Sequence, residues 1–248
     1  MSTSMMTENR IMPGGSTDKT RWLRLAIVIV TFLLLLYGLT TLSAVLGFFG
    51  VTQRSSHDII AFYAANAPTL QKALFATLLG YLLSVPVMSM VTRHYWGADR
   101  GFGSGDVMLG LVWGSLALRP LWWAAHLVLM PNILALGARG TDPAEIASFM
   151  SAFRMLDTVL NTATEDIAVN VLGGAWFVLV GREILRKGGR MVALGAITML
   201  IGVLYLLSSA ELLGMSFGEG GGILPVVVSV SGPFWMLFVG SAVALRPR

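Results

Sequence analysis

The sequence predicts an all-α integral membrane protein, a helical bundle of about six transmembrane helices. Three observations carry this prediction: 55% of the 248 residues are hydrophobic, only 12% are charged, and the apolar residues gather into long stretches. Soluble domains carry about 25% charged residues, so this chain cannot build a water-facing surface. It has no cysteine, which excludes disulfides and thiolate metal sites.

The first apolar stretch follows a polar beginning. We expect residues 1–20 to form a disordered cytoplasmic tail and residues 21–248 to form one transmembrane domain. The first span, Leu25 to Val51, exceeds the roughly 20 helical residues that cross a hydrocarbon core. It is also longer than the apolar core of a cleaved signal peptide, which has about 7–15 residues.

The second and third predicted spans contain prolines. An outer loop, Ser55 to Pro68, leads to the second span, Ala73 to Val91, which contains Pro86. The third span, Val107 to Leu136, is interrupted by Arg119-Pro120 and by Pro131. It is too long for one upright helix, so we expect it to be kinked or tilted.

The fourth predicted span has a polar helical lead-in. Its apolar part is Ile167 to Val180, and the stretch Asp142 to Asp166 before it is helix-compatible but polar. Asp142-Pro143 is typical of a helix start, with Asp as the cap and Pro in the first turn. Whether residues 145–160 lie within the bilayer or at its outer surface stays open. The fifth and sixth spans are Met191 to Leu213 and Ile223 to Leu245.

Charge asymmetry predicts the orientation. Basic residues collect in loops and termini on the side of the N-terminal tail, which places both termini in the cytoplasm by the positive-inside rule. An even number of spans agrees with this. Twelve of the 17 basic residues fall on that side: Arg10, Lys19, Arg21, Arg24, Arg93, Arg100, Arg182, Arg186, Lys187, Arg190, Arg246 and Arg248.

Two polar helix faces are candidates for chemistry. On the third span, Ser115, Arg119, Trp122 and His126 recur at spacings of four, three and four, and therefore share one face. On the lead-in and start of the fourth span, a second face is polar in the same way. Its residues are Arg154, Asp157, Asn161 and Glu165, with Asp166 and Asn170 in the adjacent row.

Charged groups inside a bilayer are tolerated when they are paired. We therefore expect Arg119 or His126 to pair with Glu165 or Asp166. A histidine beside a carboxylate could relay protons near neutral pH. The alternative is a structural clamp that fixes helix register. Arg154 and Asp157 are predicted to lie outside the bilayer, because a span ending near Val180 reaches back only about 20 residues.

Small residues mark places where helices can approach closely. Gly110 and Gly114 form a G-x-x-x-G on the third span, and Gly173 and Gly174 lie in the fourth. The three histidines lack the spacing of a zinc helix and are not matched in depth as two haem ligands would be, so we expect no metal and no cofactor.

The layout resembles a known family from about Arg24 to Leu245. The residues that carry the likeness are Gly173-Gly174-Ala175-Trp176, the basic turn Arg186-Lys187, and Pro233-Phe234-Trp235-Met236-Leu237 with Gly240. They are similar to those of the bacterial multispan membrane proteins grouped as domain of unknown function family 4386. The resemblance implies a bacterial inner-membrane protein of six or seven helices, and it implies no activity.

Three function classes remain open. The first is an accessory or structural subunit of a membrane assembly, or a membrane-stress protein, with a membrane protein partner or a second copy of itself. The second is a small transporter or channel with a polar route through Arg119, His126, Glu165 and Asp166. The third is a membrane enzyme acting on lipids, for which an interfacial cluster of acids or histidines is missing. The partners expected throughout are lipids, and nucleic acid is not expected.

Overall fold

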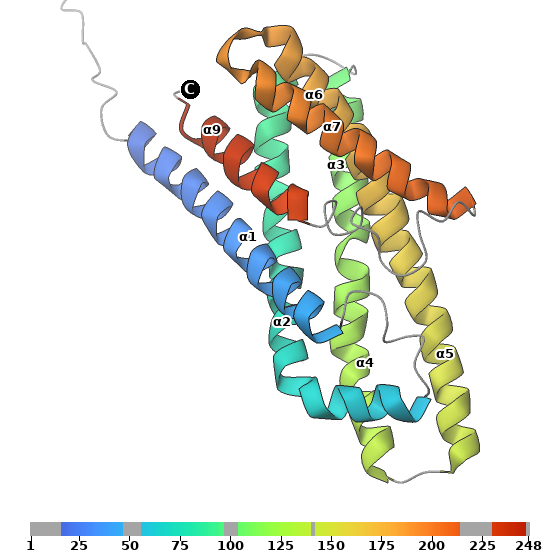
Figure 1. Cartoon of the computed structure of the whole chain (residues 1–248). Coiled ribbons are helices and arrows are strands. Elements are labelled where there is room, and N and C mark those ends of the chain that lie inside the picture. The colour runs from blue at the N-terminus through green and yellow to red at the C-terminus, as the bar shows by residue number, and fades with distance from the viewer. Residues whose placement is uncertain (1–15, 47–55, 97–103, 140–141, 214–229, 247–248) are drawn as a thin grey trace, which may run out of the picture.

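The computed structural model describes residues 16–46, 56–96, 104–139, 142–213 and 230–246, and every regular element in these ranges is helical (Figure 1). Four helical rods are long and apolar enough to cross a membrane: Lys19–Val45, Ile60–Trp96, Gly105–Leu136 and Pro143–Lys187. Two shorter apolar rods, Val192–Ser208 and Val230–Ala244, complete the bundle. The all-α prediction is therefore confirmed, and four of the expected spans have the required length.

The elements follow the sequence pattern closely. Apolar rods with no internal loop satisfy every backbone group within the helix, as a lipid environment demands. The bounds are α1 Ser16–Leu46, α2 Ser56–Trp96, α3 Ser104–Leu118, α4 Pro120–Arg139, α5 Pro143–Asn161, η1 Thr162–Gly173, α6 Gly174–Lys187, η2 Gly189–Met191, α7 Val192–Ser208, η3 Ser209–Leu213, η4 Met236–Gly240 and α9 Ser241–Ala244.

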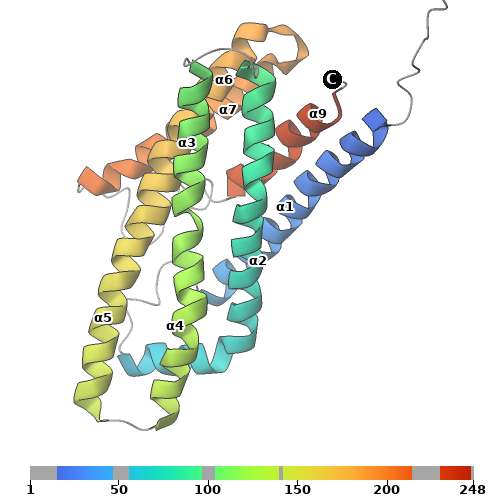
Figure 2. The same ribbon diagram turned by 180° about the vertical axis from the view of Figure 1, so that it is seen from behind.

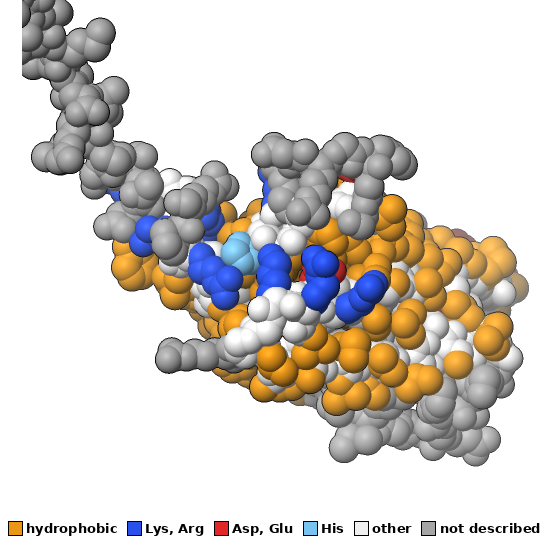
Figure 3. Space-filling view, turned by 90° about the horizontal axis from the view of Figure 1, so that it is seen from above, with side chains coloured by type: hydrophobic (Ala, Val, Ile, Leu, Met, Phe, Trp, Pro, Cys, Tyr) orange, Lys and Arg blue, Asp and Glu red, His pale blue; other side chains and the backbone are white. Residues whose placement is uncertain are grey.

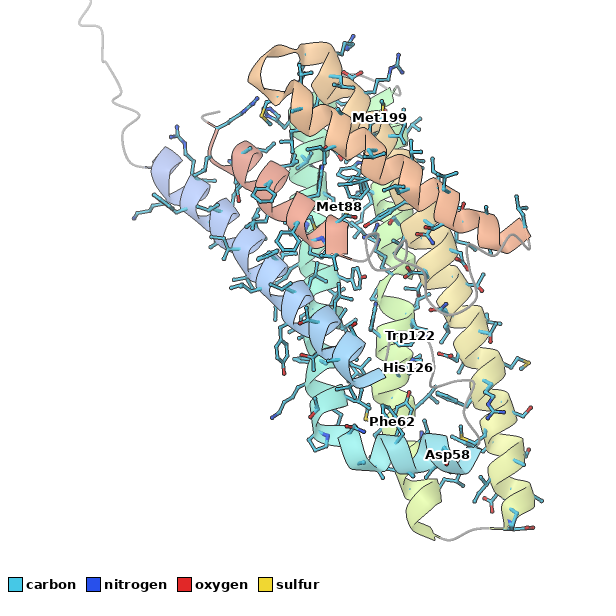
Figure 4. All side chains as sticks on the ribbon, in the orientation of Figure 1. Asp58, Phe62, Met88, Trp122, His126 and Met199 are labelled. Atoms are coloured by element: carbon cyan, nitrogen blue, oxygen red, sulfur yellow. The ribbon has the colours of Figure 1, made fainter. Side chains whose placement is uncertain are left out.

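The outer loop predicted between the first two spans is wrong over most of its length, because α2 is already helical at Ser56. Its first part runs crosswise to the remainder of the helix, and Asp58 and Phe62 lie on this crosswise part (Figure 4). Pro68 lies inside the helix. Tertiary packing accounts for the helix: Tyr63 is buried and its ring meets Phe153 of α5 edge-on, with centroids 6.4 Å apart.

The predicted interruption at Arg119-Pro120 is present. Helix α3 ends at Leu118 and α4 begins at Pro120, and the two lie nearly in line beside α2 (Figure 2). The polar lead-in and the fourth span form one rod, α5–η1–α6. As predicted, Asp142 caps it: the Asp142 carboxylate accepts a hydrogen bond from the Ala144 N–H at 3.1 Å, and Pro143 occupies the first turn.

Helices α6 and α7 form a hairpin whose backbones nearly touch. A Cβ placed on Gly181 would lie 2.5 Å from the Met199 nitrogen, and one on Gly202 would lie 2.6 Å from the Val178 nitrogen. The turn between the helices uses Gly188 and Gly189 at φ 66° and 74°, a conformation that suits glycine. Small residues thus let the two helices pack closely, which is a usual feature of helix pairs in lipid.

An aromatic cluster holds the remaining rods to this hairpin. The rings of Trp176 and Trp235 meet edge-on at 5.2 Å, with Phe177 against both. Each indole N–H is satisfied: Trp176 donates to Thr92 Oγ1 at 2.9 Å, and Trp235 donates to Thr198 Oγ1 at 2.7 Å. These contacts link α2, α6, α7 and the Val230–Ala244 rod.

Basic residues far apart in sequence gather at one end of the bundle. The view onto this end shows Lys and Arg side chains and a histidine in a row, surrounded by hydrophobic side chains (Figure 3). It is the end at which α1 starts and at which α2, α6 and α9 finish (Figure 1). The described basic residues that the sequence analysis assigned to one side therefore lie at this end of the bundle, whereas Arg10, Arg100 and Arg248 lie outside the described residues. Large exposed apolar side chains on the rods, including Leu33, Phe75, Val128 and Leu200, are suited to lipid contact.

Candidate functional site

Two irregular helices face each other at the same level of the bundle. One is the α3–α4 rod, which is broken at Arg119. The other is η1, a π-helical stretch of 12 residues, Thr162–Gly173, within the α5–η1–α6 rod. Wide π turns are rare and occur often at functional sites. The local cause of the α3–α4 break is Pro120, whose ring and missing N–H prevent the normal helical bond.

The Thr164 side chain inserts into the break. Its hydroxyl donates to the Leu118 carbonyl at 3.2 Å and accepts the Trp122 N–H at 3.4 Å. Leu118 and Trp122 are four residues apart, so in an unbroken helix they would bond to each other. A side chain of α3 bonds to the backbone of η1 in the same way: Ser115 Oγ donates to the Ala168 carbonyl at 2.6 Å. Each irregular helix therefore satisfies backbone groups of the other.

Arg119 occupies the centre of this contact and is only 4% exposed. Its Nε donates to Ser115 Oγ at 2.8 Å, and its guanidinium carbon lies 5.9 Å from the centre of the Tyr81 ring. Its Nη2 is buried and has no hydrogen-bond partner among the described residues. A buried donor without a partner is costly, and a cation more so. The guanidinium fits because residue 173 is glycine: a Cβ there would lie 2.5 Å from Nη2.

A cavity of about 30 Å³ adjoins Arg119. Its polar lining comes from Arg119, Glu165, Tyr81 and Tyr205, and residues of α1 and of the Val230–Ala244 rod close it. Both tyrosines interact electrostatically with Arg119 and with Glu165. A volume of this size holds one or two water molecules, and the lining supplies the two to four polar partners that a buried water needs. The arrangement can hold water beside a carboxylate and a guanidinium in a low-dielectric setting.

A second polar group lies further along the same two rods. His126 Nε2 is 3.2 Å from Asp157 Oδ1, and Trp122 Nε1 donates to the same oxygen at 2.7 Å. His126 Nδ1 faces the Trp122 carbonyl at 2.9 Å, and because a carbonyl can only accept, Nδ1 donates in this hydrogen bond. His126 is 4% exposed and the Asp157 side chain 11%. Trp122 and His126 are one turn apart on α4 (Figure 4).

The structure thus gives His126 a partner that differs from the prediction. The sequence analysis paired Arg119 or His126 with Glu165 or Asp166 and assigned Asp157 to a polar segment outside the bilayer. His126 contacts Asp157, which is largely buried against it, and Arg119 shares the cavity with Glu165, one of its predicted partners. Of the other candidates, Asn161 is exposed, and Asp166 is partly exposed and does not line the cavity.

Both polar groups form a layer between two apolar clusters. One cluster surrounds Trp176 and includes Leu116 and Val169, and the other includes Met130 and Phe153. Arg119, Trp122 and His126 on one rod, and Asp157, Thr164 and Glu165 on the other, fall between these positions. Sequence reasoning missed Thr164, Tyr81 and Tyr205. A threonine and two tyrosines within apolar stretches give no pattern that distinguishes them from ordinary packing residues.

The four candidate glycines lie in different environments. A Cβ on Gly174 would meet the Gly202 carbonyl at 3.0 Å, where α6 packs against α7, whereas Gly173 makes room for Arg119. Gly114 approaches Leu172 of η1, and a Cβ on Gly110 would have nothing within 4 Å. Within the described ranges, no three His, Asp or Glu side chains come together as a metal site requires.

The geometry defines a helical protein with candidate membrane spans and a buried polar layer. Comparison with models of protein families, with curated proteins and with solved structures finds no match to this chain.

Proposed function

We propose that this chain is a multi-pass protein of a bacterial inner membrane that conducts protons through the polar layer, alone or coupled to a small solute. In this proposal all six rods cross the bilayer and both termini are cytoplasmic. The positive-inside rule supports the orientation, since the basic residues gather at one end. The layout that resembles the family of unknown function fits such a protein.

The observation that carries the proposal is the cavity beside Arg119 and Glu165. Ionisable groups in membrane-spanning rods are expensive and mark ion pathways or proton relays. If Arg119 served only to fix the helix register, we would expect all of its N–H donors to be hydrogen-bonded. Its Nη2 has no partner among the described residues. The cavity of about 30 Å³ excludes an organic solute in this state but admits water. Glu165 is the group we assign to bind the proton, with Arg119 stabilising its charged form.

Interruptions in both facing rods support the same proposal. Many transporters bind their substrate and coupling ion near the bilayer midplane, where broken helices face each other. Here the α3–α4 break and η1 face each other through Thr164 and Ser115. His126 and Asp157, 3.2 Å apart, extend the polar layer beyond the cavity.

Proton flux into liposomes tests the proposal. The purified protein is reconstituted with an internal pH-sensitive dye, and a potassium gradient with valinomycin drives proton entry. We expect flux above that of protein-free liposomes, and loss of this flux in Glu165→Gln. The matched control is Asp166→Asn, which removes one charge from the neighbouring residue, outside the cavity lining, and should keep the flux. Equal loss in both variants, or no flux in the wild type over about pH 5–8, would reject conduction through Glu165.

An accessory subunit is the second candidate, and the open face at Gly110 favours it. Small residues on an exposed helix face let another membrane helix approach closely, and nothing described lies within 4 Å of a Cβ at this position. The mass of the intact particle in a mild detergent separates the candidates. A stoichiometric partner, lost in Gly110→Leu, would support the accessory subunit. A lone monomer would reject it.

A further inference from the structure

A groove at the basic end of the bundle is unrelated to the cavity at Arg119. It measures about 800 Å³ and lies between α1, α2, α3 and the end of α9. Its rim carries the guanidinium groups of Arg24, Arg93 and Arg246, together with His94. Among the described residues that line it, none is acidic. The rim is therefore a concentrated positive charge at the end of the bundle where the other basic residues lie (Figure 3).

The contact between Arg246 and His94 fixes the position of one of these charges. Arg246 Nη1 lies 3.0 Å from His94 Nε2. A guanidinium can only donate, so the imidazole nitrogen accepts and His94 is neutral in this contact. The contact fixes Arg246, from the end of the chain, over the end of α2. Three arginines from three separate rods then face one opening, and arginine forms paired hydrogen bonds with phosphate.

Below the rim the lining of the groove is mainly apolar. Its deeper wall is built from apolar side chains of α1, α2 and α9, including Ile27, Val85 and Val243. Trp113, which is 54% exposed, flanks it on α3. A site with positive charge above an apolar wall is complementary to a lipid with an anionic headgroup, which is the molecule of this kind that surrounds a membrane-spanning helix. Basic pockets between transmembrane helices recognise such headgroups.

A buried hydroxyl in the groove points to the same occupant. Ser89 Oγ is buried and has no hydrogen-bond partner among the described residues. It lies four residues before Arg93, one helical turn deeper, or about 6 Å. That is the depth at which a phospholipid carries its glycerol and ester oxygens below the phosphate. A rotation of the Ser89 side chain would bring this buried hydroxyl to an ester oxygen in the groove, which could accept its proton.

We propose that this groove is a binding site for one anionic phospholipid, with the phosphate on Arg93, Arg246 and Arg24, the ester region at Ser89 and an acyl chain along the apolar wall. The occupant comes from the bilayer leaflet at the basic end. The proposal is independent of proton conduction, since none of these residues lines the cavity at Arg119.

Native mass spectrometry of the detergent-solubilised full chain tests the site. Phosphatidylglycerol and phosphatidylcholine with the same acyl chains are titrated, and inorganic phosphate serves as a probe without chains. We expect one phosphatidylglycerol to bind more tightly than phosphatidylcholine. Near a membrane surface each basic residue contributes about fivefold in affinity for anionic lipid, so R93Q/R246Q should lose roughly 25-fold.

The matched control is Lys19→Gln with Arg182→Gln, which removes the same charge from exposed residues outside the groove. This variant should bind phosphatidylglycerol within about twofold of the wild type. Ser89→Ala changes no charge and tests the deep position: we expect weaker binding with unchanged thermal unfolding. Three results would overturn the proposal: no preference for the anionic lipid, equal losses in the control and groove variants, or displacement of the lipid by millimolar inorganic phosphate.

Discussion

Gly173 holds open the space that the Arg119 guanidinium occupies, since a Cβ at residue 173 would lie 2.5 Å from Arg119 Nη2. The guanidinium thus occupies the space that a side chain at this position of the facing helix would fill. Packing between the two rods at Gly173 therefore sets the position of Arg119, the only guanidinium that lines the described cavity.

Gly173→Ala should therefore destabilise the protein and displace Arg119. Overpacking of this kind costs about 1–3 kcal/mol. Gly110→Ala is the matched control, because its Cβ meets open space; it should be neutral or stabilising, since Ala is the better helix former. Thermal unfolding in detergent measures both. Equal stability of the two variants would show that the guanidinium relocates freely.

Thr164→Val should cost more than a threonine change elsewhere on the same rod. It removes the hydroxyl that bridges the Leu118 carbonyl and the Trp122 N–H, and leaves both backbone groups exposed to an apolar methyl. The expected loss is about 1–3 kcal/mol. Thr158→Val is the control, because that exposed hydroxyl bonds only to its own helix, at the Arg154 carbonyl. Indistinguishable unfolding temperatures would contradict the bridging role.

The His126–Asp157 pair should show a measurable coupling energy. Single variants His126→Gln and Asp157→Asn and their combination form a double-mutant cycle. Polar contacts between membrane helices are worth about 0.6 kcal/mol on average and up to about 1.7 kcal/mol. Because both side chains are largely buried but Trp122 still donates to the same carboxylate oxygen when His126 is replaced, we expect a coupling near the average value. Additivity within about 0.3 kcal/mol would mean that the pair contributes nothing as a pair.

Single-cysteine labelling can establish the orientation, because the natural chain has no cysteine. Lys19→Cys and Glu145→Cys place exposed thiols near opposite ends of the bundle. In intact bacteria an impermeant maleimide should label residue 145, and should label residue 19 only after permeabilisation. The cysteine-free chain controls for background. Labelling of both positions from the same side would contradict three membrane crossings between them.

The sequence predicts some parts of this structure well because they depend on local chemistry. The Arg119-Pro120 break follows from the missing N–H, and the start of α5 at Asp142-Pro143 follows from capping. The common face of Ser115, Arg119, Trp122 and His126 follows from the period of 3.6 residues, and all four side chains take part in the polar layer.

The partner of His126 could not be predicted in this way. The face shared by Asp157 and Glu165 was derived from α-helical periodicity, but η1 begins at Thr162, between them. A π segment has no recognisable sequence pattern, and it changes the phase of every later residue. The helical start of α2 was missed for a different reason: His57, Asp58, Asn66 and Pro68 are typical of a loop, whereas packing of Tyr63 against Phe153 favours a helix.

The π stretch also determines how α5 is rotated about the axis of the α5–η1–α6 rod relative to α6. A π turn holds more residues than an α turn, so a return of η1 to α geometry would rotate the α5 side about the axis of the rod. Asp157 would swing away from His126 and Trp122, and Thr164 would leave the gap before Pro120. The contacts of Asp157 with His126 and Trp122 therefore hold α5 in one rotational position relative to α4.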